Sequence, residues 1–162
     1  MSNNKGFSLV EIVVVITVLM IILSVVVLNF GNVVKWQLNK CAESIDDNLN
    51  SIKVTTLSDS QKNSGLTLSD NDGYLYMEIN DNDPIKLGVF SVTVYYEDIN
   101  RANVASVDVE DQSITMSFNN NGAFNEIEEI NGMYVKSIVI TKGSYTRSII
   151  CERLTGKHYI SE

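Results

Sequence analysis

The stretch KGFSLVEIVVVI, from Lys5 to Ile16, places a single carboxylate, Glu11, near the start of a long apolar run. Between residues 12 and 28 only two hydroxyl side chains interrupt a series of Val, Ile, Leu and Met. The 22 residues from Leu9 to Phe30 would span about 33 Å as an α-helix, the thickness of a bilayer's hydrocarbon core. Because backbone groups in lipid must bond to one another, the run predicts a transmembrane helix despite its many β-branched residues.

Glu11 is the feature that a plain membrane anchor does not explain. An ionised carboxylate deep in a membrane helix costs about 2.5 to 3.5 kcal/mol on insertion scales, less near the interface, and indicates a functional site by default. No basic residue lies between Lys5 and Lys35, so the partner is expected to be a chain terminus, a lipid head group or another molecule. A cleaved signal peptide is disfavoured because the run is long and lacks a small-residue cleavage pattern. A plain single-span anchor stays open as the alternative.

The same stretch resembles the prepilin signature of type IV pilins and type II secretion pseudopilins. In that signature a short basic leader ends in Gly, Phe follows, and Glu stands five residues after the Gly, next to an apolar run. The resemblance implies that a membrane aspartyl peptidase cuts between Gly6 and Phe7 on the cytoplasmic side and methylates the new amine. It also implies that in the filament this amine pairs with Glu11 of a neighbouring subunit.

The resemblance extends to location and partners. It implies a single-pass protein of the cell membrane with a cytoplasmic N-terminus and an external head, which then enters an extracellular or periplasmic filament. Prepilin peptidase and other pilins or pseudopilins, contacted through the N-terminal helix, are the expected partners. One departure concerns Met20 and Leu28, which stand where relatives commonly have Gly and Pro. Without these helix breakers, we expect the helix to be straighter than in many relatives.

The helical pattern continues beyond the apolar run. Apolar residues recur mainly at steps of three and four, with polar residues between them: Phe30, Val33, Val34, Leu38, Cys41, Ile45, Leu49, Ile52 and Leu57. This spacing predicts an amphipathic helix that ends near Leu57. A helix from Phe7 to Leu57 would be about 75 Å long. We expect its second half to pack against a head.

After the helix the apolar pattern changes to a period of two. Short segments bounded by Gly, Asn and Asp read as strands: residues 65–69, 74–79, 85–96, 104–109, 113–118, 134–141, 145–153 and 157–161. They predict an antiparallel sheet of hairpins packed on the second half of the helix, an α+β, pilin-like fold. The expected organisation is a leader at residues 1–6, a transmembrane and assembly helix at 7–30, and a head at 31–162.

Composition argues against several functions. The chain of 162 residues carries a net charge of −8, and residues 43–132 hold 17 acidic but only four basic side chains, which disfavours binding to polyanions. No nucleophile elbow, phosphate loop or pair of catalytic carboxylates is present, so we expect no enzyme activity and no cofactor. The Asn/Asp turns at 70–73 and 80–83 lack the ligand spacing of a calcium loop, and no metal site is expected. His158, the only histidine, is expected to be exposed and without a role.

The late segments SITMSFNNNGAF and TRSIICERLTGKHYI resemble those of H-type minor pseudopilins and related minor pilins. This implies a subunit near the filament tip or one that helps to start assembly. Some of those relatives bind DNA through a C-terminal Gly-Arg-x-Arg motif, and residues 156–159 here read Gly-Lys-His-Tyr. A DNA-binding face for uptake, with Arg147, Arg153 and Lys157, is therefore the alternative function. A solvated end strand whose charges offset the acidic middle would explain the same residues.

Two cysteines, Cys41 and Cys151, fall on the side of the membrane run where the head is expected. An even count in an exported chain suggests a disulfide that ties the head to its helix. Two buried thiols that act as small apolar residues are the other reading.

Overall fold

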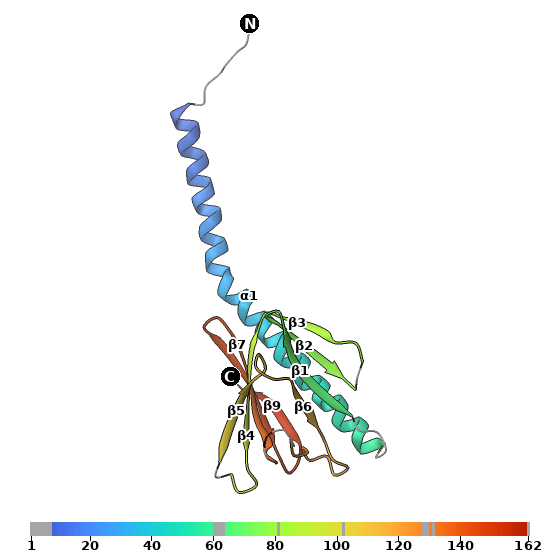
Figure 1. The fold of residues 1–162 in the computed structure, drawn as a ribbon. Coiled ribbons are helices and arrows are strands. Elements are labelled where there is room, and N and C mark those ends of the chain that lie inside the picture. The colour runs from blue at the N-terminus through green and yellow to red at the C-terminus, as the bar shows by residue number, and fades with distance from the viewer. Residues whose placement is uncertain are drawn as a thin grey trace. The chain divides into compact units, whose positions relative to one another are not determined.

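The computed structural model describes residues 8–59, 64–80, 82–101, 103–127, 130 and 132–161, with the side chains of 25–29 left out. The chain divides into two units, residues 1–35 and 36–162. A single helix, α1 (Leu9–Ser58), belongs to both (Figure 1). The predicted helix is thus confirmed to within one residue of its expected end.

In the first unit α1 presents only exposed side chains between residues 9 and 24. Ser8 precedes the helix and its Oγ accepts a hydrogen bond from the Val10 amide at 3.3 Å, which caps the N-terminus. Thr17 Oγ1 donates to the Val13 carbonyl at 2.8 Å. Ser24 Oγ likewise donates to the Ile21 carbonyl at 2.7 Å, so the helix itself satisfies both hydroxyl side chains inside the apolar run.

Among the described residues, no helical stretch combines the length and the mean hydropathy of a membrane span. The predicted span at 7–30 includes Phe7 and the side chains of residues 25–29, which lie outside the described part of the chain.

In the second unit α1 has a buried face. Its buried apolar residues recur at steps of one, three and four: Leu38, Cys41, Ala42, Ile45, Leu49 and Ile52. These are the middle residues of the predicted stripe with Ala42 added. The prediction also included Phe30, Val33 and Leu57, which are exposed, and Val34, which is half-buried. Near the end of the helix Thr56 is buried, and its Oγ1 donates to the Ile52 carbonyl at 3.0 Å. The helix therefore presents one side to the core until its last turn.

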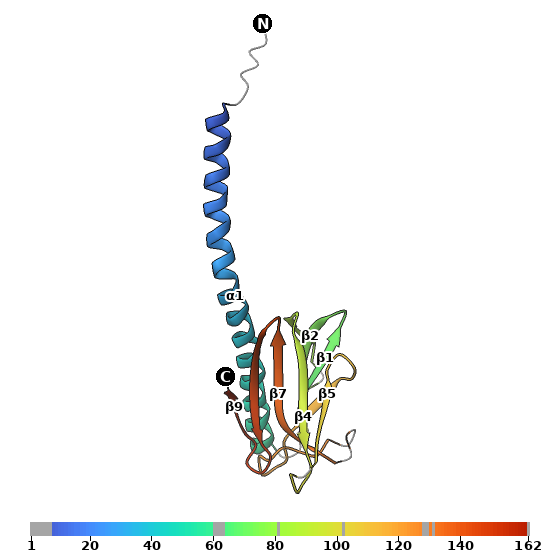
Figure 2. The ribbon, with the colours of Figure 1, turned by 90° about the vertical axis from the view of Figure 1, so that its left-hand side faces the viewer.

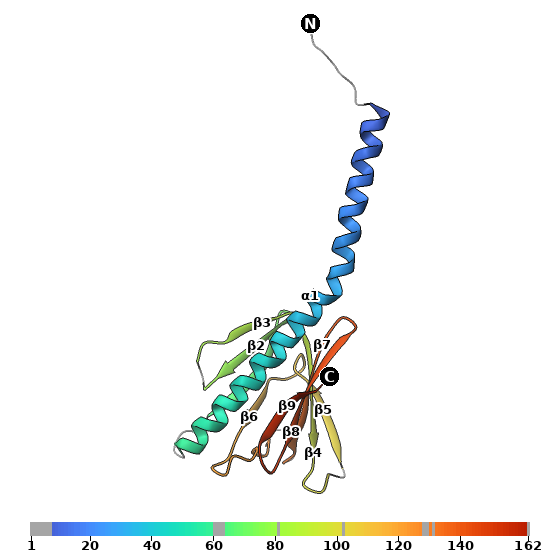
Figure 3. The same cartoon turned by 180° about the vertical axis from the view of Figure 1, so that it is seen from behind.

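The strands form two antiparallel sheets (Figures 1 and 2). The four-stranded sheet has the order β3 (Ile85–Gly88), β2 (Tyr74–Ile79), β1 (Gly65–Asn71) and β6 (Ile114–Ser117). The five-stranded sheet has the order β5 (Val104–Asp108), β4 (Ser91–Glu97), β7 (Tyr134–Lys142), β8 (Tyr145–Glu152) and β9 (Lys157–Ser161). The second half of α1 runs along the strands (Figure 3), and buried residues of both sheets and of α1 form one apolar cluster. The α+β class is confirmed, but with two sheets in place of the expected one.

Gly88 explains the second sheet. The segment predicted as one strand, 85–96, divides there into β3 and β4. Gly88 has φ +132°, a conformation that favours glycine, and an added Cβ would lie 3.0 Å from the Phe90 ring. β3 pairs with β2, whereas β4 pairs with β5 and β7. The chain thus changes sheet within two residues, which alternation of apolar side chains alone could not reveal.

Candidate functional site

Glu11 lies in the first turn of α1, where a carboxylate interacts favourably with the helix dipole. Its side chain is exposed, as are those of its apolar neighbours Val10 and Ile12. No ion pair joins it to another described residue of the chain. Between residues 9 and 24, Glu11 is the charged side chain on a helix surface that is otherwise mostly apolar. It could therefore form an ion pair with a partner outside the chain.

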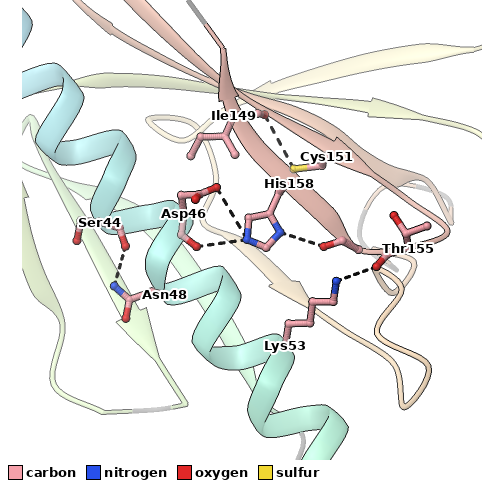
Figure 4. Close-up of polar contacts among 9 residues, drawn as sticks. Ser44, Asp46, Asn48, Lys53, Ile149, Cys151, Thr155 and His158 are labelled. Atoms are coloured by element: carbon pink, nitrogen blue, oxygen red, sulfur yellow. Dashed lines mark hydrogen bonds and ion pairs between the residues drawn. The ribbon is translucent and has the colours of Figure 1, made fainter.

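A second site is a buried contact between α1 and β9 (Figure 4). His158 is only 8% exposed, and its Nδ1 lies 3.0 Å from the Gly156 carbonyl oxygen. Its Nε2 lies 3.3 Å from the Asp46 carbonyl oxygen and 3.9 Å from Asp46 Oδ1. The expectation of an exposed histidine without contacts is wrong, because the turn between β8 and β9 returns the chain onto the helix.

Asp46 supplies the charge at this contact. Its Oδ1 is buried and has no hydrogen-bond partner. Burial raises the pKa of the Asp46 carboxyl, and the neighbouring His158 opposes that rise. The rings of Phe118 and Phe124 lie 6.1 and 6.2 Å from the His158 ring, centroid to centroid. These two aromatic rings therefore contribute to the burial of the His158 ring.

The turn before His158 fixes the position of β9. Gly156 has φ +57°, and an added Cβ would overlap the Gly122 carbonyl oxygen. Beside it, Lys53 Nζ donates to the Thr155 carbonyl at 2.8 Å (Figure 4). The C-terminal turn is thus held by α1 on one side and by the loop at Gly122 on the other.

The disulfide suggested for Cys41 and Cys151 is not formed. Cys41 and Cys151 are both free and buried. Cys151 pairs with His158 in the β8–β9 register and lies near Asp46, five residues further along α1 than Cys41. Five residues correspond to about 7.5 Å along a helix, so the two thiols occupy different levels of the core. Burial raises the pKa of each thiol to about 12, as expected for small apolar core residues.

Comparison with known proteins addresses the N-terminal site. Residues 1–27 match the family model described as the prokaryotic N-terminal methylation motif, which contains Gly6, Phe7 and Glu11. The chain carries the prepilin signature of type IV pilins and pseudopilins. No curated protein and no solved structure matches the chain. The assignment therefore rests on the N-terminal sequence alone. Two of its residues, Gly6 and Phe7, lie outside the described part of the structure.

Downstream of the prepilin signature, the candidate DNA-binding side chains have separate surroundings. Arg147 Nε donates to Asn39 Oδ1 on α1 at 2.7 Å. Arg153 donates from Nη1 to the Ile99 carbonyl at 3.1 Å, and its guanidinium lies 4.8 Å from the centre of the Tyr134 ring. Lys157 is exposed at the start of β9. Two of the three cations thus contribute to internal contacts of the head.

Sequence reasoning missed two residues of the α1–β9 contact, Asp46 and Lys53. Both stand among the polar positions of an amphipathic helix, where a solvated side chain is the usual expectation. They differ from the other polar residues of the helix only by their contact partners. His158 lies 112 residues after Asp46, and Thr155 lies 102 residues after Lys53. Gly156 offered the one usable signal, because a glycine before a basic strand indicates a tight turn.

Proposed function

We propose that this chain is a minor pilin or pseudopilin, a structural subunit of a type IV pilus or a type II secretion-like filament. The observation that carries the proposal is the methylation motif at residues 1–27. A helix whose side chains are all exposed between residues 9 and 24 supports it, because such a surface calls for a partner outside the chain. Assignment to the H-type minor subunits, near the filament tip, rests on the late-sequence resemblance alone.

Processing supplies the partner for Glu11 in this proposal. Prepilin peptidase cleaves between Gly6 and Phe7, and the new α-amine at Phe7 carries a positive charge. In the filament this amine pairs with Glu11 of a neighbouring subunit. Opposite charges attract more strongly in a low-dielectric surrounding than in water, and an unpaired buried charge is heavily penalised. Glu11 therefore favours one stagger between adjacent helices.

Before assembly, the subunit is held in the cell membrane by residues 7–30, with the N-terminus in the cytoplasm and the head outside. The apolar run from Leu9 to Phe30 supports this step, since its length as a helix matches a bilayer's hydrocarbon core. On release from the membrane the same residues contact other pilins, so that one surface serves first lipid and then the filament.

The test is the mass and N-terminal sequence of the chain, isolated from membranes of cells with and without prepilin peptidase. A chain that begins at N-methylated Phe7 only in the presence of the peptidase is the expected result. A Gly6→Leu variant serves as control and should keep its original N-terminus in both strains. A wild-type chain that still begins at Met1 in peptidase-containing cells would return the protein to the plain-anchor interpretation.

DNA binding in uptake is the weaker proposal, because Arg147 and Arg153 already bond to Asn39 and to the Ile99 carbonyl. Phosphate contacts weaken steeply as salt rises. Binding of duplex DNA to the full chain, measured between low and physiological salt, tests this alternative. Lack of binding at low salt, or binding that persists in a Lys157→Gln, Arg147→Gln, Arg153→Gln variant, would remove it.

A further inference from the structure

A pocket of about 290 Å³ lies between α1, strand β3 and the end of strand β7, entirely within the second unit. Each of these three elements contributes one lysine to its lining: Lys40, Lys86 and Lys142. Lys40 Nζ pairs with the exposed Glu43 at 2.6 Å, but none of the described lining residues is itself acidic. In a chain with a net charge of −8, this pocket is a local concentration of positive charge.

The other two lysines have contacts that orient their amino groups without neutralising them. Lys142 Nζ donates to Gln37 Oε1 at 2.8 Å and lies 4.6 Å from the centre of the Phe90 ring. Lys86 Nζ lies 3.1 Å from the centre of the Tyr74 ring. Neither lysine forms an ion pair with a carboxylate of the described residues. Because an amide and aromatic rings carry no net charge, the pocket keeps at least two uncompensated positive charges.

An anion suits this set of side chains. Like charges that line one pocket repel each other, and an anion between them converts that repulsion into attraction. Lysine binds phosphate as a point charge and needs no fixed geometry to do so. Trp36 also lines the pocket and is 61% exposed, so an aromatic ring with a polar N–H group stands beside the three amino groups.

The position of the pocket in the chain indicates where the phosphate comes from. Trp36 follows Phe30, the last residue of the apolar run, by six residues. Six residues cover about 9 Å as a helix and only about 20 Å when fully extended. If residues 7–30 span the membrane, Trp36 therefore lies near the lipid head groups, the level at which tryptophan is enriched in membrane proteins. Helical side chains lean toward the N-terminus, which brings Lys40 closer to the same level.

We propose that this pocket binds the phosphate of an anionic phospholipid while the subunit is in the membrane. The inference rests on the membrane stage of the proposed function and adds a lipid preference to it. A lysine close to an anionic membrane surface favours binding by about fivefold. Three lysines together would hold this end of the head against anionic lipid, with Trp36 among the head groups.

The experiment uses the full chain reconstituted in vesicles of phosphatidylcholine mixed with phosphatidylglycerol. Trp36 is the only tryptophan of the chain, so its fluorescence reports on this site without a label. Quenching by brominated phosphatidylglycerol, compared with quenching by brominated phosphatidylcholine in the same mixture, gives the relative affinity of the two lipids. We expect the anionic lipid to be favoured about tenfold or more at low salt, with a smaller preference as salt rises.

Two double variants with the same loss of charge locate the preference. Lys40→Gln, Lys86→Gln leaves the hydrogen bond of Lys142 in place and should reduce the preference to about twofold or less. The control is Lys136→Gln, Lys157→Gln, at the starts of β7 and β9 and thus at the opposite end of the five-stranded sheet from Lys142. It should keep the wild-type preference, and both variants should keep the wild-type thermal midpoint.

The other outcomes are distinct from one another. Equal quenching of the wild type by the two brominated lipids would overturn the lipid preference and leave the proposed membrane segment in place. Absence of quenching by either lipid would overturn both. Equal preferences in the two double variants would show that net charge, and not this pocket, attracts the lipid. A preference abolished by glycerol phosphate at constant ionic strength would identify a soluble phosphate compound as the ligand instead.

Discussion

The two parts of α1 differ in how far the chain itself completes them. Between residues 9 and 24 every side chain is exposed, although most are apolar. Between residues 38 and 52 the apolar side chains are buried against two sheets. Burial of apolar surface stabilises by about 25 cal/mol per Å², so the first part gains this stabilisation only from contacts outside the chain, which in the proposed function are lipid and other subunits. In that proposal one part of the helix folds the head and the other part assembles the filament.

The largest effect is expected where the head is most tightly packed, at Gly156. Gly156→Ala would place a Cβ on the Gly122 carbonyl oxygen, so we expect the free energy of unfolding to fall by about 3 kcal/mol or more. Gly143→Ala is the matched control: its φ is +61°, yet nothing lies within 4 Å of the added Cβ. That variant should lose only about 1 kcal/mol. Equal losses, measured by urea unfolding, would show that backbone conformation and not close packing limits both sites.

His158→Gln tests the contact between α1 and β9. A glutamine cannot face the Gly156 and Asp46 carbonyl oxygens at once, so the head should lose about 1 to 3 kcal/mol of stability. Tyr159→Phe, at the adjacent and exposed position, should change stability by less than about 0.5 kcal/mol. Denaturant unfolding of both variants gives the answer. A His158→Gln variant as stable as wild type would mean that pairing with β8 and packing against Phe118 and Phe124 hold β9 without this contact.

Glu11→Val examines the other end of α1. Filament incorporation should fall about tenfold or more because the neighbour's amine loses its partner, while the unfolding midpoint of the head stays unchanged. Thr17→Val removes a polar side chain that already bonds within the helix and should incorporate normally. The readout is the fraction of each variant in sheared filaments. A head destabilised by Glu11→Val would contradict the separation of the two parts.

A further effect, confined to alkaline pH, is expected from the two thiols. Their folded pKa is raised to about 12 from an ordinary 9.0. Stability from this source is complete below pH 9 and declines as pH rises toward 12, because the unfolded thiols ionise first, by at most about 1.4 kcal/mol per pH unit and thiol. Urea unfolding at pH 8, 9 and 10 should show a smaller decline for the Cys41→Ala, Cys151→Ala variant. Parallel declines would contradict buried free thiols.

The elements of this fold were predictable because their signals are local. Steps of three and four predicted that the helix ends near Leu57, one residue before its observed end at Ser58, and alternation placed the β7 and β8 strands within a residue or two. The exchange of sheets at Gly88 was not predictable, because it depends on which strand pairs with which. For the same reason the sequence could not show that His158 contacts Asp46. Contacts between residues that lie far apart in the chain produce no periodic pattern in the sequence.

Continuity of α1 also has a mechanical consequence. Tension on the N-terminal part of the helix passes along one unbroken backbone into its second half. There the load is shared by side-chain contacts to the five-stranded sheet and its last turn, at Gln37, Asn39, Asp46 and Lys53. These contacts are spread over 17 residues, or about 24 Å of helix, and a pull along the axis strains them together. Force along the helix axis would therefore load several contacts of the head in shear at the same time.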